Sequence, residues 1–172
     1  MLKIKAISEC LRARYYGIFY EVGKHCSFGK VVFNTFPKKG SIKIGNSVNI
    51  FRYTELCADP GKPIIIGDGT FINQGCIIRP NTTIGKNVCI GPNVSLVTDT
   101  HEIGSHEKRA GKLKFPPIVI GDGCWIGIGS IVLGDVKVGS GTVIAAGSLV
   151  NRDCDPNCLY GGIPAKLLRK LM

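Results

Sequence analysis

The sequence has no apolar run long enough to cross a bilayer, and it is short of acidic residues, with 12 Asp and Glu against 22 Lys and Arg. A transmembrane helix needs about 20 predominantly apolar residues in succession, so we expect no membrane-spanning segment. The first residues lack the apolar core of a signal peptide, because Lys3 and Lys5 interrupt them. The eight cysteines include no C-x-x-C pair. We therefore expect reduced, structural cysteines and a cytoplasmic protein, or one peripheral at the inner face of the membrane.

The net charge of +10 raises the question of nucleic-acid binding. Basic residues gather at the two ends and between Lys108 and Lys114, without interleaved aromatic residues or a nucleic-acid-binding motif. We therefore expect no nucleic acid as a partner. The charge fits a solvated surface, an anionic small ligand, or weak attraction to an acidic polymer or a membrane surface.

An aliphatic residue returns at every sixth position over most of the chain. These anchors fall in three series: Ile44, Ile50 and Leu56; Ile66, Ile72, Ile78, Ile84, Ile90 and Leu96; and Ile120, Ile126, Val132, Val138, Ile144 and Val150. A period of six matches neither the period of about 3.6 that gives a helix one buried face nor the period of about two of a strand. It predicts short strands and tight corners repeated along a solenoid.

The positions around each anchor repeat as well. A small or β-branched residue stands two places before most anchors, as at Thr70, Cys76 and Cys124. Because side chains alternate along a strand, we expect this residue to share the interior with the anchor. Glycine often follows the anchor, as at Gly67 and Gly127, and is expected to point outward. The pattern predicts an all-β solenoid with the anchors in its core.

The segment before the solenoid, residues 1–40, lies outside the repeat. Apolar residues at helical spacing between Ile4 and Ile18 predict a basic amphipathic helix near residues 3–20. We expect this helix to cover the first coil, with membrane-surface contact as the alternative role.

The solenoid is predicted for residues 41–155, and one polar loop at 97–119 interrupts its repeat. A regular scaffold that extrudes one polar loop usually displays functional residues there. Residues 156–172 form a tail, in which residues 165–170 predict a short helix that closes the other end.

The extruded loop contains two of the three histidines, His101 and His106. Imidazole suits proton transfer at neutral pH, since its unperturbed pKa is about 6.5. His101, where the coil gives way to the loop, is therefore a candidate base, with an inert surface histidine as the alternative. His106 and His25 are expected to be inert. No metal site is expected, because the two loop histidines lack a third ligand on a neighbouring coil.

Two residues on the solenoid itself stand out. Trp125, the only tryptophan, precedes the anchor Ile126, so alternation points it outward beside Gly127. This pair predicts a hydrophobic wall next to a groove, or a subunit contact, and the two are compatible. Asn73 occupies the slot after an anchor that glycine usually fills, where its amide either orients a ligand or is solvated.

Several longer motifs extend this pattern. They are Thr-Asp-Thr-His at 98–101, Pro-Pro-Ile-Val-Ile-Gly-Asp-Gly-Cys-Trp-Ile-Gly at 116–127, Ile-Ala-Ala-Gly-Ser-Leu-Val at 144–150, and Gly-Gly-Ile-Pro-Ala-Lys-Leu-Leu-Arg at 161–169. Together they resemble the hexapeptide-repeat O-acetyltransferases, in the branch of maltose, galactoside and nodulation-sugar acetyltransferases and their polysaccharide-modifying relatives. The resemblance covers about residues 44–170. It includes the family's spacing of 24 residues from histidine to tryptophan, here from His101 to Trp125.

The resemblance implies a left-handed parallel β-helix that forms a homotrimer with active sites between subunits. It implies acetyl-CoA as co-substrate, no required metal, His101 as the catalytic base, and Asn73 near the acceptor. The residues that it places along coenzyme A are Trp125, Gly127, Ile128, Ala146, Asn151, Arg152, Lys166 and Arg169. Lys166 keeps a positive charge for phosphate but lacks the bidentate geometry of a guanidinium.

One position departs from the family with consequences for the acceptor. Asn81 stands on the acceptor side where maltose-type enzymes carry an acidic residue, so free maltose or a galactoside is not the expected acceptor. The sequence predicts an acetyl-CoA-dependent O-acetyltransferase that modifies a sugar hydroxyl in surface polysaccharide or its precursors. The alternatives are acetylation of an antibiotic or other small acceptor, and a non-catalytic binding or scaffold solenoid.

Overall fold

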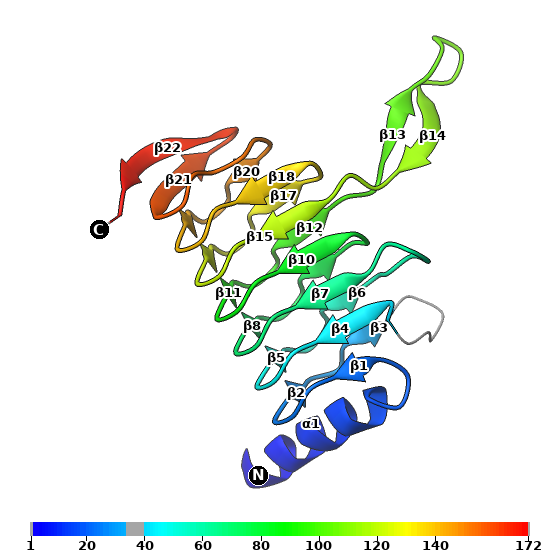
Figure 1. Cartoon of the computed structure of the whole chain (residues 1–172), viewed down its shortest axis with the longest axis vertical. Helices are drawn as coiled ribbons and strands as arrows, with labels where there is room; N and C mark the ends of the chain where they lie inside the picture. Colours follow the sequence, from blue (N-terminus) through cyan, green and yellow to red (C-terminus); the bar gives the residue numbers. More distant parts are fainter. Residues whose placement is uncertain (1, 34–39, 172) are drawn as a thin grey trace.

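The protein folds as a left-handed parallel β-helix: the six-residue repeat predicts the solenoid, and the family resemblance predicts its hand. The structure is a computed structural model and describes residues 2–33 and 40–171, with only the backbone described for residues 2–7. One helix, α1 (Leu2–Tyr16), precedes the coils, and three parallel sheets form their three faces (Figure 1). No helix among the described residues is long and apolar enough to cross a membrane.

Each sheet takes one strand from successive coils. Sheet A contains β1 (Glu21–Val22), β4 (Ile42–Ile44), β7 (Ile64–Ile66), β10 (Thr82–Ile84), β15 (Ile118–Ile120) and β18 (Val136–Val138). Sheet B contains β2 (Ser27–Phe28), β5 (Asn49–Ile50), β8 (Phe71–Ile72), β11 (Cys89–Ile90), β16 (Trp125–Ile126), β19 (Val143–Ile144), β21 (Cys158–Gly162) and β22 (Ala165–Lys170). Sheet C contains β3 (Val32–Phe33), β6 (Glu55–Leu56), β9 (Ile77–Ile78), β12 (Ser95–Val97), β17 (Ile131–Leu133) and β20 (Leu149–Val150).

The anchors stack on one another from coil to coil. In sheet A, Ile66 pairs with Ile84 and Ile84 with Ile120, and all three side chains are buried. The small residues before the anchors are buried too, as predicted, and their polar atoms have partners: Thr70 Oγ1 donates to Gly85 O at 2.8 Å, and Cys76 Sγ to Gly91 O at 3.2 Å. Burial raises the pKa of the Cys76 thiol to about 11. The thiol therefore fills the core as a compact apolar group.

The glycines that follow the anchors do not point outward, contrary to the prediction. A Cβ at Gly67 would lie 2.6 Å from the Gly85 carbonyl carbon, and one at Gly127 would lie 2.6 Å from Ala146 N. The missing side chain would point along the solenoid axis into the backbone of the next coil. Glycine is needed there because the coils approach each other closely.

The first coil begins before residue 41, which corrects the predicted start of the solenoid. Strands β1, β2 and β3 pair in parallel with β4, β5 and β6, so residues 21–33 already form a coil. Its sheet B anchor is Phe28 and its sheet C anchor is Phe33, only five residues later. A search for aliphatic residues at every sixth position misses this coil, because these two anchors are aromatic and stand five residues apart. Helix α1 covers it through Ala13, which is buried, and Tyr16, whose ring lies 4.2 Å from that of Phe33.

The short C-terminal helix predicted for residues 165–170 is wrong. That segment is strand β22, antiparallel to β21 at the end of sheet B. Without β22, the edge of β21 would expose its backbone donors and acceptors. Pairing with that edge overrides the helical propensity of the Leu-Leu-Arg-Lys sequence.

The predicted extruded loop is a β-hairpin of its own. Strand β13 (Thr100–Ile103) pairs antiparallel with β14 (Ala110–Lys114) as a separate two-stranded sheet. The hairpin leaves the solenoid between sheets C and A and projects away from it (Figure 1).

Candidate functional site

The structure divides the predicted site residues between two corners of the solenoid. The B–C corner follows the strands of sheet B, and the C–A corner follows the strands of sheet C. Asn73, Ile128 and Ala146 lie at the B–C corner, beside Trp125 on sheet B. At the C–A corner lie Asn81, Asn151, Arg152 and, on the hairpin, His101.

The outer face of sheet B carries the residues predicted for coenzyme A. Trp125 is 57% exposed. Across successive strands of sheet B, Trp125 lies opposite Val143, Val143 opposite Leu159, and Leu159 opposite Arg169. Directly paired residues point to the same side of a sheet. Trp125 and Arg169 therefore belong to one row of outward side chains and lie three strand spacings apart, or about 14 Å.

The B–C corner runs beside this row. Ile128 is 52% exposed, and its carbonyl accepts a hydrogen bond from Gly147 N at 2.8 Å. Its own amide has no acceptor among the described residues of the chain. Ala146 lies on the next coil in the same place. This corner thus carries an exposed apolar side chain and a backbone donor that has no partner among the described residues.

Asn73 and Lys166 extend the same corner in opposite directions. Asn73 N donates to Ile90 O at 3.0 Å on the coil that stacks on it, and Gly91 N donates to Ile126 O at 2.8 Å. The Asn73 side chain is half-buried and accepts from Gln74 N at 2.8 Å. Lys166 is exposed on β22, opposite Gly161. Asn73 thus lies on one side of Ile128 along the solenoid axis, and Lys166 on the other.

At the C–A corner, His101 is exposed on β13 and lies opposite Leu113 of β14. Asp99, two residues earlier, accepts from the Arg79 guanidinium: Nη2 donates to Oδ2 at 2.8 Å and Nε to Oδ1 at 3.1 Å. Arg79 Nη1 also lies 3.4 Å from Glu55 Oε1. Of the two acidic residues nearest His101 in the sequence, Asp99 is tied to the solenoid, and Glu102 is exposed.

The ion pair at this corner fixes the charges near His101. The Arg79 hydrogen bond lowers the pKa of Asp99, and the charge of His101 lowers it further. The bond to Asp99 in turn raises the pKa of Arg79. Asp99 is therefore a carboxylate at neutral pH, and its charge is largely compensated by the guanidinium. Arg79 was not predicted as a site residue, and only its position one coil below the loop hinted at this contact.

Asn81 has its amide engaged within the chain. Its backbone is in the left-handed region, with φ of 60°, and its Nδ2 donates to Phe115 O at 2.8 Å. Asn151 and Arg152 are exposed at the same corner, after β20. They lie on a different corner from Ile128, so in one chain they do not continue the coenzyme A strip.

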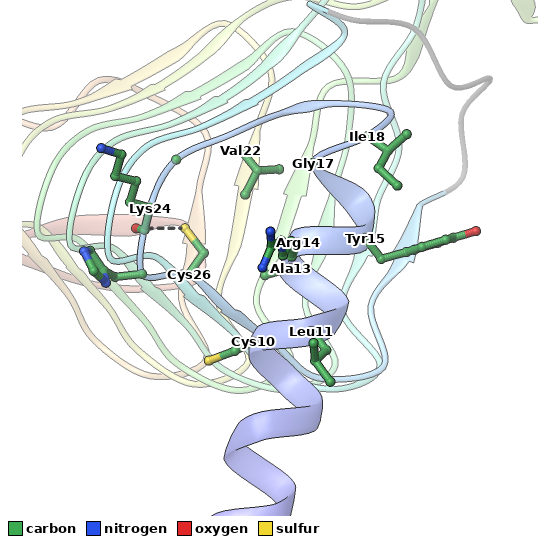
Figure 2. A pocket seen from close by; sticks show the side chains of 12 residues that line it. Cys10, Leu11, Ala13, Arg14, Tyr15, Gly17, Ile18, Val22, Lys24 and Cys26 are labelled. Carbon is green, nitrogen blue, oxygen red and sulfur yellow. Dashed lines mark hydrogen bonds between the residues drawn. The ribbon is translucent and has the colours of Figure 1, made fainter.

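The other two histidines lie away from both groups. His106 is exposed beyond β13, towards the tip of the hairpin. His25 lines a cavity of about 830 Å³ between α1 and the first coil, together with Arg14, Lys24 and Cys26 (Figure 2). Neither His101 nor Trp125 lines this cavity. Within the described part of the chain, no group of three or more His, Cys, Asp or Glu side chains is placed to hold a metal ion.

Comparison with known proteins gives a consistent picture. Residues 63–97 and 117–152 match the family described as bacterial transferase hexapeptide (six repeats), which leaves out the hairpin. A Saccharomyces cerevisiae protein named "Putative acetyltransferase YJL218W" is 39% identical over 115 residues, 66% of this chain and 59% of that protein. A Schizosaccharomyces pombe protein, "Putative acetyltransferase C18B11.09c", is 45% identical over 78 residues, 45% of this chain and 38% of that protein. The chain spans less than two thirds of the length of either relative.

Solved structures resemble the whole chain. The hexapeptide-repeat-containing acetyltransferase VCA0836 of Vibrio cholerae is 29% identical, with a TM-score of 0.70 over 99% of this chain and 86% of that chain. Its complex with acetyl coenzyme A matches with a TM-score of 0.66 and 27% identity, over 99% of this chain and 87% of that chain. AntD, an N-acyltransferase from Bacillus cereus, matches with a TM-score of 0.78 over 94% of this chain and 88% of that chain. At 19% identity, AntD shares the fold alone.

Proposed function

We propose that this chain, which carries the hexapeptide repeat of the bacterial transferases, is an acetyl-CoA-dependent acetyltransferase that modifies a sugar hydroxyl. Support for the donor comes from the Vibrio cholerae acetyltransferase, whose structure contains acetyl coenzyme A. Sequence relatives named as acetyltransferases support the same activity.

The observation that carries this proposal is the division of the site between two corners. His101 belongs to a hairpin at the C–A corner, whereas Trp125 and Ile128 lie on sheet B and its B–C corner. A site that uses both groups requires the hairpin of one chain to lie against sheet B of another. A closed homotrimer with three such clefts satisfies this requirement. The exposed Ile103 and Leu113 of the hairpin would then be covered by the neighbouring chain.

The coenzyme fits along sheet B. Trp125 and Ile128 would contact its apolar arm, and Lys166 and Arg169 at the C-terminal end would meet its phosphates, where positive charge and hydrogen-bond donors are favourable. The strip is open enough for such a ligand because Trp125, Ile128, Lys166 and Arg169 are all exposed.

The acceptor hydroxyl would approach from the hairpin side. Neutral His101 removes the hydroxyl proton while the oxygen attacks the thioester carbonyl, and general-base help of this kind contributes about 10²–10⁴-fold. The free Ile128 amide would donate a hydrogen bond to the oxyanion. Collapse of the tetrahedral intermediate releases the ester and the CoA thiolate, which takes the proton from the imidazolium. No acyl-enzyme is formed.

The first test is His101→Ala. We expect turnover to fall by at least about two orders of magnitude, while acetyl-CoA binding measured by calorimetry is largely kept. His106→Ala is the matched control on the same hairpin and should retain turnover. Free CoA should be quantified by chromatography, because Cys10 and Cys89 are exposed and would react with a thiol reagent. Near-normal acetylation by His101→Ala would eliminate the assignment of the base.

The shared site has its own test in mixed oligomers. Co-expression of His101→Ala with Trp125→Ala chains should restore activity at about a quarter of the sites, by random assortment around a ring. If both residues acted within one chain, no mixture of the two variants would recover activity.

The acceptor class is tested with a panel of soluble polysaccharide fragments, nucleotide sugars, amino sugars and hydroxylated antibiotics. We expect ester formation on the sugar hydroxyls. Transfer to an antibiotic would favour the alternative of a small-molecule acetyltransferase, and an amide product would overturn O-acetylation. Absence of acetyl-CoA affinity in calorimetry would leave a non-catalytic scaffold as the function.

A peripheral location at the membrane is part of the proposal. Leu11 and Tyr15 on α1 and Ile18 in the turn that follows it are exposed, while Arg14 and Lys24 nearby carry positive charge. Such a surface is attracted to anionic lipid. Co-sedimentation with phosphatidylglycerol vesicles, but not with phosphatidylcholine vesicles, is the expected result. Equal recovery with both lipids, or with neither, would remove this part.

A further inference from the structure

The corner formed by Arg79, Pro80 and Asn81 holds both legs of the hairpin that carries His101. On the entering leg, Arg79 binds Asp99, and Thr98 Oγ1 donates to Pro80 O at 2.6 Å. On the returning leg, Asn81 Nδ2 donates to Phe115 O at 2.8 Å. Three consecutive residues of one coil thus hold both ends of the hairpin, which projects from the next coil.

These contacts are sheltered, in contrast to the hairpin itself. Thr98 and Pro80 are buried, and the side chains of Arg79 and Asp99 are only 29% and 27% exposed. Every residue of β13 is exposed. A two-stranded hairpin is marginally stable alone, so its direction must be set at the base or by a neighbouring chain. Among the described residues, the side-chain hydrogen bonds between the hairpin and the solenoid lie at the base.

We propose that Arg79 is a positioning residue for the base, acting through Asp99 on the leg that leads directly to His101. This inference rests on the proposed function and deepens it. The bidentate geometry fixes the carboxylate in direction as well as distance, and an error of about 1 Å at a reacting group costs about 100-fold in rate.

The same contact sets the charge that His101 faces. Besides Asp99, the charged groups around the imidazole are Glu102 on its own strand, Lys112 and Lys114 on β14, and Arg79, which Glu55 also contacts. Lys114 is paired with Thr100, so it lies on the opposite side of the hairpin from His101. Asp99 and Arg79 therefore form the charge pair that is fixed in place near the imidazole.

Removing one member of this pair should shift the pH–rate profile in a direction that depends on which member is lost. In Arg79→Gln the uncompensated carboxylate favours the protonated imidazole, which cannot act as a base. The acid limb of kcat should then move to higher pH by about one unit. In Asp99→Asn the remaining guanidinium disfavours the imidazolium, and the limb should move to lower pH.

The experiment compares pH profiles of the full-length protein with saturating acetyl-CoA. For Arg79→Gln we expect kcat at neutral pH to fall about 10- to 100-fold, with KM for acetyl-CoA within about twofold of the unaltered protein. Arg79→Lys keeps the charge but not the bidentate geometry, so the limb should return while kcat recovers only in part. Asp99→Asn preserves the shape of the side chain and serves if Arg79→Gln folds poorly.

Asn81→Gly is the matched control on the returning leg. Glycine tolerates the positive φ of this position, and the change removes only the amide that binds Phe115. It should lower kcat without moving the acid limb.

Three outcomes would overturn the inference: wild-type rates in Arg79→Gln, an unmoved acid limb in both Arg79→Gln and Asp99→Asn, or movement of the limb in the same direction in both. An active His101→Ala protein would instead overturn the proposed function itself.

Discussion

The coils and the β13–β14 hairpin bury their apolar residues to opposite extents. Along the coils, Ile72, Ile90 and Ile126 are completely buried, whereas on the hairpin Ile103 is 90% exposed and Leu113 is 48% exposed. Each inner coil pairs with the coils before and after it. Among the residues that the structure describes, the two strands of the hairpin pair only with each other, and hydrogen bonds join its base to the solenoid.

This difference suggests that the coils determine the stability of the fold, whereas the hairpin serves acetyl transfer or subunit association. The coil interior stabilises a stack that is complete within one chain, so its substitutions should affect unfolding. The hairpin adds little to that stack, so its substitutions should affect transfer, association of subunits, or neither. The comparison to test is therefore whether substitutions in the coils change the free energy of unfolding while substitutions in the hairpin leave it unchanged.

The largest effect is expected from Ile90→Ala in the coil interior. Deleting this buried side chain in the middle of sheet B should lower the free energy of unfolding by about 2–5 kcal/mol. Ile103→Ala on the hairpin is the matched control and should leave the unfolding of the solenoid unchanged. Urea denaturation followed by circular dichroism measures both. Equal destabilisation by the two variants would show that the hairpin is part of the cooperative stack.

Much of this contrast could be predicted from the sequence, because the coils are specified locally. Ile66, Ile72 and Ile78 mark three faces of one coil, and the small residues before the anchors fill its corners, so period and polarity together define the solenoid. The interruption of that period also marked the hairpin and His101 within it.

The errors arose where tertiary contacts decide the structure. Phe28 and Phe33 replace aliphatic anchors in the first coil, and β22 is a strand only because β21 offers it an edge. The Arg79–Asp99 pair joins residues 20 positions apart, and nothing in the repeat requires it. Gly127 was expected to point outward because its sequence position does not reveal how closely the next coil approaches.

The reactivity of the cysteines compares the surface of the solenoid with its interior. Burial raises the pKa of Cys76 to about 11 and of Cys154 to about 12, so both stay protonated at pH 8. Cys89 is exposed beside Trp125 in sheet B. Alkylation followed by mass spectrometry should modify Cys89 about 100-fold faster than Cys76.

Acetyl-CoA sharpens this labelling experiment. If the coenzyme lies along sheet B as proposed, it should slow the alkylation of Cys89 while leaving that of Cys10, which is exposed on α1, unchanged. Unaltered labelling of Cys89 at saturating acetyl-CoA would place the coenzyme elsewhere.

A smaller effect on stability is expected from the carboxylates that link coils at the corner between sheets A and B. Asp122 Oδ1 accepts from Lys86 N at 2.7 Å, and Asp68 Oδ1 accepts from Asn46 N at 2.7 Å. Asp122→Ala should lower the free energy of unfolding by about 1 kcal/mol, because it leaves the Lys86 amide to solvent. Glu107→Ala on the hairpin removes a carboxylate without such a contact and should change nothing.

The smallest effect concerns the joint between the two regions and depends on pH. Because Arg79 lowers the pKa of Asp99, the pair contributes stability above the ordinary pKa of an aspartate, about 3.9, and loses it as pH falls through the lowered value. The contribution should be at most about 1 kcal/mol, as for other partly exposed pairs. At pH 6 the free energy of unfolding of Asp99→Asn should therefore lie slightly below that of the unaltered protein. The two free energies should converge as the pH falls below the lowered pKa of Asp99. A Glu107→Gln variant should show no such convergence, since its carboxylate is on the exposed hairpin. A difference for Asp99→Asn that grows on acidification would contradict the sign of the coupling, and with it the view that the hairpin's base belongs energetically to the coils.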